Sequence, residues 1–361
     1  MHGVDYTAMQ RSVTAAARSL CVRRMATASS PPTSLAAAVS TAPGAGLALI
    51  APQQGVSWTY EELDLKARKL ACGLEDIGYK EGDVAISDVP NVAENLLLQL
   101  ALSHVGASIC TPPKDAAAAE KLRAAGHRIR GIITVDGAQP PDEASIGARD
   151  AVPLCYVSVS DGLRPPSGSV DFNELLTHCP PRGGAPAAKE DTVLGIYGGA
   201  ALTHGSAIDL GTDAARKLQL TSADRVCCSV TLMHAMGIAT TCSSALVSGA
   251  AVVLPAVGGI KGCGNPTQRA SVTLDVLAAT KTTALFGDSH TLKALRALDS
   301  GLLPPAGQLA LRTGVFKVGS GSAFLDGVTE IAAGKGEDKP TPLEFLGVTF
   351  HAMGKKAAAG K

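Results

Sequence analysis

The sequence predicts a layered α/β fold in which helices cover the faces of parallel β-strands. Between residues 45 and 352, short apolar runs of strand length alternate with longer segments of helical periodicity, an order typical of parallel sheets. The chain has 361 residues, of which 46% are hydrophobic and 18% charged. This length and composition favour a folded domain with a sizeable buried core over a disordered chain.

Composition also argues against some classes of partner and site. Lys plus Arg and Asp plus Glu both number 32, and aromatic residues make up only 3%, so we expect no nucleic-acid partner. We expect no membrane span, because no apolar run reaches the roughly 18 residues that a spanning helix needs. The nine cysteines show no CxxC spacing, and we interpret them as small buried residues that form neither a disulfide nor a metal site.

Residues 1–30 have the composition of a mitochondrial targeting segment. Asp5 is the only acidic residue before Tyr60, and four arginines of this segment stand among Ser, Thr and Ala. Targeting segments are Arg-rich, Ser-rich and acid-poor, so we predict a mitochondrial location, on the matrix side. A disordered arm with no targeting role is the alternative. We assign residues 31–44 to a Ser/Pro/Ala-rich linker and residues 353–361 to a frayed Lys/Ala/Gly tail.

The first half of the domain is predicted to begin with a capped helix. Thr59 and Glu62 have the spacing of a capping box, apolar residues follow at helical intervals, and Gly78 comes after the last of them. Further strands are expected at 84–86, 107–110 and 131–135, and further helices at 92–105, closed by Gly106, and at 116–125.

The second half begins after a Pro/Gly/Ala-rich stretch at residues 179–188, which predicts a flexible boundary inside the domain. The alternation of apolar runs and helical periodicity then resumes. Strands are expected at 193–197, 251–254 and 283–286, and helices at 213–218, 237–247, 273–279 and 290–298.

Short segments spread along the chain carry the pattern of a known family; the main ones are residues 59–63, 80–86, 224–234, 248–254 and 311–314. In this order they resemble the AMP-binding, adenylate-forming superfamily, which includes acyl-CoA synthetases, luciferases and peptide-synthetase adenylation domains. The resemblance covers about residues 45–352 and implies the layered N-terminal domain of that family. The small C-terminal domain with the family's catalytic Lys is expected to be absent, since the chain ends at Lys361.

The resemblance implies where ATP phosphates would bind, and the sequence departs from the family there. The family's loop reads Tyr-Thr-Ser-Gly-Thr-Thr-Gly-x-Pro-Lys-Gly, in which glycines admit the phosphates while hydroxyls and a Lys hold them. In the corresponding segment, Ala201 and Leu202 replace the hydroxyl pair and Ser206 replaces the Lys. The remnant of this loop consists of Tyr197, Gly198, Gly199, Thr203 and Gly205.

The family's second motif, Tyr-Gly-x-Thr-Glu, supplies an aromatic ring near adenine and a carboxylate for magnesium. Residues 346–350 match it best, with Gly347 and Thr349 as the remnant. Phe350 stands at the position of the carboxylate, and a phenyl group cannot bind a hard cation. We therefore expect no metal site.

The family's acyl pocket has its remnant at His234, Gly237 and Gly287, although a histidine in so apolar a run is more often buried for packing. His204 could replace the missing positive charge, but a loop residue is the simpler interpretation, as it is for Lys261. Ser289 is interpreted as a helix cap rather than a nucleophile. Residues 319–321 are interpreted as a turn rather than a dinucleotide fingerprint.

The loss of phosphate and metal ligands predicts a degenerate, catalytically inactive protein, because removing even one charge-stabilising group costs about 10²- to 10³-fold in rate. We expect a pseudoenzyme that serves as a structural or interaction subunit of a mitochondrial protein complex and needs no cofactor. A non-catalytic module that binds an acyl chain, acyl-CoA or AMP is one alternative. A divergent or split AMP-forming acid–CoA ligase is another, and only these alternatives require ATP, AMP or CoA.

Overall fold

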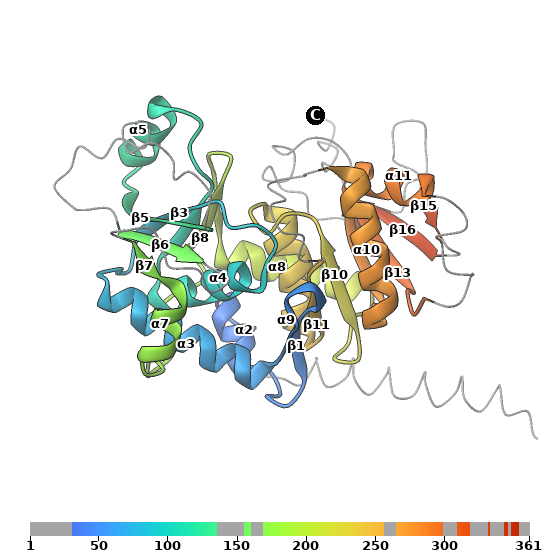
Figure 1. Cartoon of the computed structure of the whole chain (residues 1–361), viewed down its shortest axis with the longest axis horizontal. Helices are drawn as coiled ribbons and strands as arrows, with labels where there is room; N and C mark the ends of the chain where they lie inside the picture. Colours follow the sequence, from blue (N-terminus) through green and yellow to red (C-terminus); the bar gives the residue numbers. More distant parts are fainter. Residues whose placement is uncertain are drawn as a thin grey trace, which may run out of the picture. The chain divides into compact units, whose positions relative to one another are not determined.

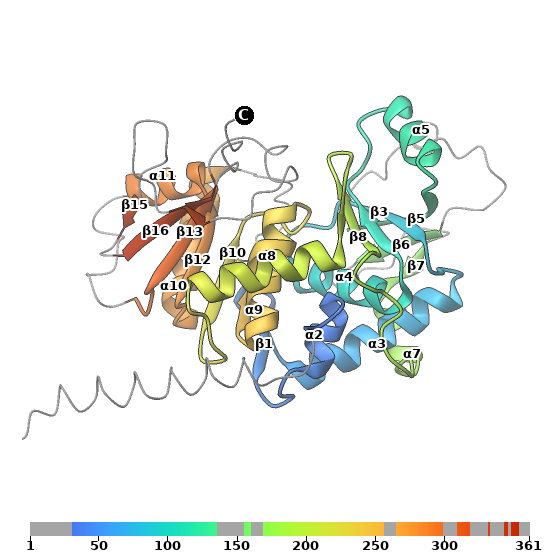
Figure 2. The ribbon, with the colours of Figure 1, turned by 180° about the vertical axis from the view of Figure 1, so that it is seen from behind.

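The computed structural model describes residues 31–135, 155–159, 169–255, 265–298, 309–317, 331–332, 343–345 and 348–353. Residues 33–361 form one compact unit, which contains two β-sheets and the helices around them (Figure 1; Figure 2). The predicted α/β class and its parallel strands are confirmed. Within the described residues, no helix combines the length and hydropathy needed to cross a membrane.

The smaller sheet is built mainly from the first half of the chain. Its strand order is β7-β6-β5-β3-β4-β8-β9, and all neighbouring strands are parallel except the β8–β9 hairpin. Its strands are β3 (Asp83–Ser87), β4 (Ser108–Cys110), β5 (Arg128–Val135), β6 (Cys155–Val159), β7 (Val170–Asp171), β8 (Val193–Tyr197) and β9 (Ala200–Thr203).

The larger sheet combines the second half of the chain with one early hairpin. Its order is β14-β16-β13-β12-β10-β11-β1-β2, with β15 beside β16, and the six strands from β16 to β1 run parallel. Its strands are β1 (Leu47–Ala51), β2 (Val56–Thr59), β10 (Arg225–Ser229), β11 (Ala251–Val253), β12 (Ala284–Asp288), β13 (Thr313–Lys317), β14 (Ile331–Ala332), β15 (Leu343–Phe345) and β16 (Val348–Met353).

The two sheets share one hydrophobic core, because helices from both halves of the chain pack between them (Figure 1). Two outer helices cover the other face of the larger sheet, and one covers the other face of the smaller sheet. The inner helices are α3 (Tyr60–Asp76), α4 (Ala93–Val105), α8 (His204–Lys217) and α9 (Ser243–Ser248); the outer ones are α10 (Pro266–Thr280), α11 (Ser289–Ala297) and α5 (Ala116–Ala124).

Local signals placed the first helices correctly. The capping box at the start of α3 is present, with Thr59 accepting a hydrogen bond from the Glu62 backbone N–H and the Glu62 carboxylate accepting from Thr59 N. Gly78, after the end of α3, and Gly106, at the end of α4, have φ of 96° and 81°, the left-handed conformation that glycine adopts without strain.

The assignment of residues 31–44 to a linker is wrong. Helix α2 (Leu35–Thr41) occupies this segment, Ser34 caps it, and the side chains of Leu35 and Val39 are buried in the main core. Composition misled here, because the small residues of this stretch serve close packing against the inner helices.

Two helices begin earlier than predicted. Helix α8 starts at residue 204 rather than 213, and α10 starts at residue 266 rather than 273. Thr203 caps the first of these helices, and Asn265 caps the second, where Pro266 occupies the first helical position. Glycines inside α8 hid the helical pattern.

Residues 179–188, predicted to be a flexible boundary inside the domain, are attached to the neighbouring helix α3. The strands on both sides of this stretch belong to the same sheet, and helix α7 (Phe172–His178) leads directly into it. Arg182 is tied to α3 by its backbone N–H, which donates to Arg68 O, and by its side chain, which pairs with Glu75. The segment is thus attached to the domain surface along its length.

Candidate functional site

In open α/β sheets, ligands bind outside the carboxyl ends of the parallel strands. In the larger sheet these ends include Ser229 of β10, Asp288 of β12 and Lys317 of β13. In the smaller sheet, β8 ends at Tyr197, immediately before the expected phosphate loop. The candidate site is therefore the set of residues around these strand ends.

The remnant of the phosphate loop is a tight β-hairpin. Tyr197 pairs with Ala200, and the two residues between them, Gly198 and Gly199, have φ of 61° and 88°. Two successive positive φ values define the type I′ turn that closes two-residue hairpins. Gly198 N donates to Thr111 Oγ1 at 3.1 Å, so the turn is also anchored to the exit of β4.

The hydroxyl groups after this turn start helix α8. Thr203 Oγ1 accepts from Ser206 N at 3.2 Å and lies 3.0 Å from Ser206 Oγ. Gly205 N donates to Glu190 O at 2.8 Å, and a Cβ at residue 205 would lie only 3.0 Å from that oxygen. Thr203 and Gly205 therefore already have structural roles in the helix start.

His204 faces the core, which corrects its interpretation as a loop residue or an anion ligand. The side chain is fully buried, and its Nδ1 accepts from Leu35 N at 3.4 Å. Burial lowers the pKa of His204 to about 4, because an imidazolium ion loses its hydration in the core. His204 is therefore neutral at physiological pH and carries no positive charge toward a phosphate.

A buried polar chain links the exits of the two sheets. Tyr197 Oη donates to Gln99 Oε1 at 3.1 Å, and Gln99 Nε2 donates to Asn95 Oδ1 at 2.8 Å and to Leu232 O at 3.4 Å. Asn91 Nδ2 donates to Val230 O at 2.6 Å, which fixes the same segment after β10. The amides of α4 thus join the glycine hairpin to the exit of β10.

The expected acyl-pocket residues lie in the segment that follows β10 and near the carboxyl end of β12. His234 Nδ1 accepts from Met236 N at 3.0 Å, and its Nε2 lies 3.1 Å from Nζ of Lys317. Gly237 allows a π-helix, η2 (Met236–Cys242), to approach the exit, because a Cβ there would collide with Thr231 O. Gly287 lies on β12, one residue before the strand ends.

Sequence reasoning missed Lys317. It ends the strand that was recognised only at residues 311–314, and its contact with His234 joins residues 83 positions apart in sequence. The available signal was its position at a carboxyl strand end, where a cation can meet a ligand. The pair of Lys317 and His234 provides a cationic group and an imidazole that suit a carboxylate or phosphate.

The segment that resembles a nucleophile elbow begins helix α11. Asp288 is the cap, since its side chain accepts from Thr291 N at 2.6 Å, so the assignment of Ser289 as the cap is corrected by one residue. Burial alone would raise the pKa of Asp288, but its hydrogen bonds to Thr291 and the Arg269 guanidinium at 2.9 Å lower it overall.

The expected match to the second motif is wrong in its register. Thr349 and Phe350 lie within strand β16, paired in parallel with β13, and the Phe350 ring is fully buried against Gly314. A residue in mid-strand cannot hold a metal at the carboxyl end. Gly347, Lys261 and residues 319–321 lie outside the described residues.

Comparison with known proteins agrees with this architecture. The family model of AMP-binding enzymes matches residues 35–295. A 4-coumarate–CoA ligase of Humulus lupulus is 33% identical over 118 residues, which cover 32% of this chain and 21% of the relative. The acyl-CoA ligase sidI of Aspergillus fumigatus is 22% identical over 293 residues, 74% of this chain and 47% of the relative. The chain spans less than half the length of these curated relatives.

A mitochondrial acyl-coenzyme A synthetase of Mus musculus is 29% identical over 144 residues, 39% of this chain and 24% of the relative. Among solved structures, the anthranilate CoA ligase AuaEII superposes with a TM-score of 0.64 and 17% identity, over 82% of this chain and 57% of that one. A benzoate CoA ligase of Burkholderia xenovorans gives a TM-score of 0.61 and 17% identity, over 81% and 57%. The chain belongs to the AMP-binding enzyme family, with the fold of the N-terminal domain of acyl-CoA ligases.

Proposed function

We propose that this chain is a catalytically inactive acyl-CoA ligase-like protein that acts as a structural or interaction subunit in mitochondria. The observation that carries this proposal is that the segment after the glycine hairpin lacks free phosphate-binding side chains. Ala201 and Leu202 provide no hydroxyl, and Thr203 and Ser206 hydrogen-bond each other at the start of α8. A triphosphate would meet backbone N–H groups but none of the side chains that the family uses to hold it.

Two further observations support this role. Removal of one preorganised charge-stabilising group costs about 10²- to 10³-fold in rate, and here several are replaced at once. The mitochondrial part of the proposal rests on the Arg-rich, acid-poor composition of residues 1–30 and on the partial similarity to a mitochondrial mouse synthetase.

Pyrophosphate release from ATP-Mg with a panel of carboxylic acids tests the inactivity, and we expect none above background. Turnover that is lost in Gly199→Val but kept in Gly126→Val would contradict the proposal and indicate a divergent or split ligase. The two glycines are matched, because both have positive φ (88° and 86°) and neither has an atom within 4 Å of an added Cβ. A difference between the variants would therefore report on the loop rather than on backbone strain.

Native purification of the full chain from mitochondria tests the subunit role. We expect a partner at fixed stoichiometry that persists at high salt, because a subunit interface buries more area than a transient contact. Recovery of the chain as a free monomer in the matrix would contradict this part of the proposal while leaving the inactivity untouched.

A second candidate function is the binding of an acid-containing ligand without turnover. The contact between Lys317 and His234 at the strand exits favours it. Thermal unfolding with AMP, acyl-CoA and free carboxylic acids tests it, since a ligand of the folded state raises the melting temperature by mass action. The shift should vanish in Lys317→Met and persist in Lys293→Met, a change at an exposed residue of α11.

A further inference from the structure

Two cysteines from distant parts of the chain lie where α7 packs against α3. Cys72 lies in the last turns of α3, and Cys179 follows the last residue of α7. Both are half-buried free thiols, and they lie close enough that each affects the pKa of the other. Helices α3 and α7 lie side by side in both views (Figure 1; Figure 2).

The Cys179 side chain packs closely against α3. Its Sγ lies 3.6 Å from Asp76 Oδ2, and a Cβ on Gly73 would lie 3.2 Å from that sulfur and 2.8 Å from Leu175 Cβ. Gly73, the sequence neighbour of Cys72, therefore permits the close approach of α7. Cys72 and Cys179 are only half-buried, so the interpretation of the cysteines as buried residues is wrong for these two.

The backbone after Cys179 is fixed to the same helix. Arg182 N donates to Arg68 O at 3.0 Å, Arg68 Nε donates to Arg182 O at 2.8 Å, and the Arg182 side chain pairs with Glu75 at 2.9 Å. These bonds attach the backbone N–H, the carbonyl oxygen and the side chain of Arg182 to α3. The segment that follows Cys179 is consequently held against α3, the helix that contains Cys72.

A second pair of cysteines offers a contrast inside the same molecule. Cys228 lies close enough to Cys242 to raise its pKa, but both are fully buried in the main core. A bulky thiol reagent cannot reach them without unfolding. A neighbouring thiol is thus common to both pairs, and access from solvent distinguishes them.

We propose that Cys72 and Cys179 form a dithiol site that reacts with small-molecule disulfides such as oxidised glutathione and closes to an intramolecular disulfide. One thiolate attacks the disulfide, forming a mixed disulfide and releasing one glutathione thiol. The second thiolate attacks the protein sulfur of that mixed disulfide and expels the other glutathione. The protein loses two protons and two electrons, and oxidised glutathione is reduced to two thiols.

The surroundings regulate this reaction through the thiolate fraction. Burial, followed by the hydrogen bond and charge of Asp76, raises the pKa of Cys179, and burial followed by the charges of Asp76 and Glu75 raises the pKa of Cys72. Exchange proceeds through thiolates, so the site reacts slowly at neutral pH and faster as pH rises. Neutralising Asp76 should accelerate it.

The closed disulfide joins α3 to the segment that leads into β8. It encloses a loop of about 100 residues, which is long enough for a cross-link to restrict the unfolded chain substantially. Strands β3, β4, β5, β6 and β7 all lie inside this loop. Oxidation therefore stabilises the smaller sheet against local unfolding.

Mass spectrometry of the folded full-length chain after treatment with oxidised glutathione tests the proposal. We expect the loss of two hydrogens and a cross-linked peptide that contains Cys72 and Cys179, while Cys228 and Cys242 stay reduced. Cys72→Ser and Cys179→Ser should each keep one glutathione on the remaining thiol. Stable glutathione on both thiols of the unmodified chain, or no reaction at either, would overturn the proposal.

Asp76→Asn provides a second measurement that does not remove a thiol. We expect faster disulfide formation than in the unmodified chain at neutral pH, and equal rates at a pH where both thiols are ionised. Unchanged rates at neutral pH would overturn the proposed control by Asp76. Circular dichroism of each variant establishes that the fold is retained.

Discussion

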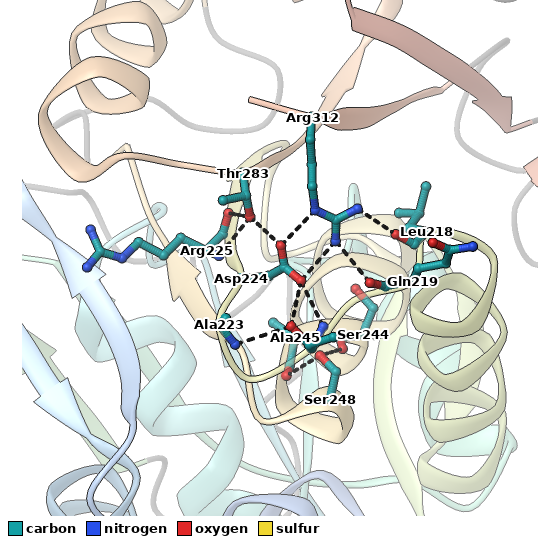
Figure 3. Close-up of polar contacts among 11 residues, drawn as sticks. Leu218, Gln219, Ala223, Asp224, Arg225, Ser244, Ala245, Ser248, Thr283 and Arg312 are labelled. Atoms are coloured by element: carbon teal, nitrogen blue, oxygen red, sulfur yellow. Dashed lines mark hydrogen bonds and ion pairs between the residues drawn. The ribbon is translucent and has the colours of Figure 1, made fainter. Parts of the chain in front are cut away.

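Arg312 holds Asp224 through two parallel hydrogen bonds, with Nε 2.9 Å from Oδ1 and Nη2 2.8 Å from Oδ2 (Figure 3). The same guanidinium donates to the carbonyl oxygens of Leu218 and Gln219 at 2.9 and 3.0 Å. The end of α8, the start of β10 and the residue before β13 are thus joined by one side chain. Two of the segments on which the family resemblance rests are in contact here.

Arg312→Ala should lower the free energy of unfolding by about 2 kcal/mol, because it leaves a buried carboxylate without its charged partner. Arg216→Ala is the control, since Arg216 also pairs with an aspartate but its side chain is 72% exposed. That change should cost less than about 0.5 kcal/mol. Urea unfolding of both variants measures the difference, and equal effects would contradict this role of the Arg312 pair.

The Arg312 pair should also make stability depend on pH in acid. Burial alone would raise the pKa of Asp224, but hydrogen bonds from Arg312 and Thr283 lower it below the ordinary value of 3.8. A carboxyl group with a lowered folded pKa contributes stability above its unfolded value, and this contribution is lost as pH falls below it. The stability difference between the unmodified chain and Arg312→Ala should therefore shrink below pH 3.8.

Two buried histidines should make the free energy of unfolding depend on pH in a second, higher range. Burial lowers the pKa of His104 and of His204 from 6.5 to about 4. At pH values between these two pKa values, each histidine therefore takes up a proton when the protein unfolds. Their contribution is complete above pH 6.5 and is lost as pH falls toward 4, with a slope of up to about 1.4 kcal/mol per pH unit for each residue. His204→Gln should roughly halve this slope in urea unfolding, and an unchanged slope would contradict the assignment.

Gly314 and Phe350 form a tight contact between β13 and β16. A Cβ at residue 314 would overlap the Phe350 ring, so Gly314→Ala should cost about 2 kcal/mol through overpacking. Adding Phe350→Leu should recover part of this loss, while Gly183→Ala, which has open space around it, should cost less than about 1 kcal/mol. Thermal unfolding of the double variant that shows no recovery would contradict the contact.

Much of the fold could be predicted because its signals are local. The capping box at Thr59, the glycine after α4 and the short apolar strands each depend on a few neighbouring residues. Their order along the chain was sufficient to predict a parallel α/β domain. The start of α8 was missed because Gly211, whose lack of a side chain lets Ser243 of α9 approach, interrupts the helical pattern for reasons of tertiary packing.

The candidate site was less predictable because its contacts join distant residues. The tie between Lys317 and His234, the burial of His204 and the meeting of Cys72 with Cys179 all depend on how the helices cover the sheets. The second motif was misplaced at Phe350 since its short pattern also fits a strand, and only pairing with β13 fixes the register.

The hydrogen bond between Tyr197 and Gln99 offers a test of how the two sheets are joined. Gln99→Leu should cost roughly 2 to 3 kcal/mol, because it leaves buried polar partners on Tyr197, Asn95 and Leu232 unsatisfied. Tyr197→Phe removes one hydroxyl and should cost about 1 kcal/mol.

The double variant of Tyr197→Phe and Gln99→Leu should lose less stability than the sum of the two single variants. Gln99→Leu alone leaves the buried Tyr197 hydroxyl without a hydrogen-bond partner, and Tyr197→Phe removes that hydroxyl. Urea unfolding of the three variants measures this coupling. Strict additivity would mean that the chain of amides in α4 does not connect the glycine hairpin to the exit of β10, and the hairpin would then be held by its turn and by Thr111 alone.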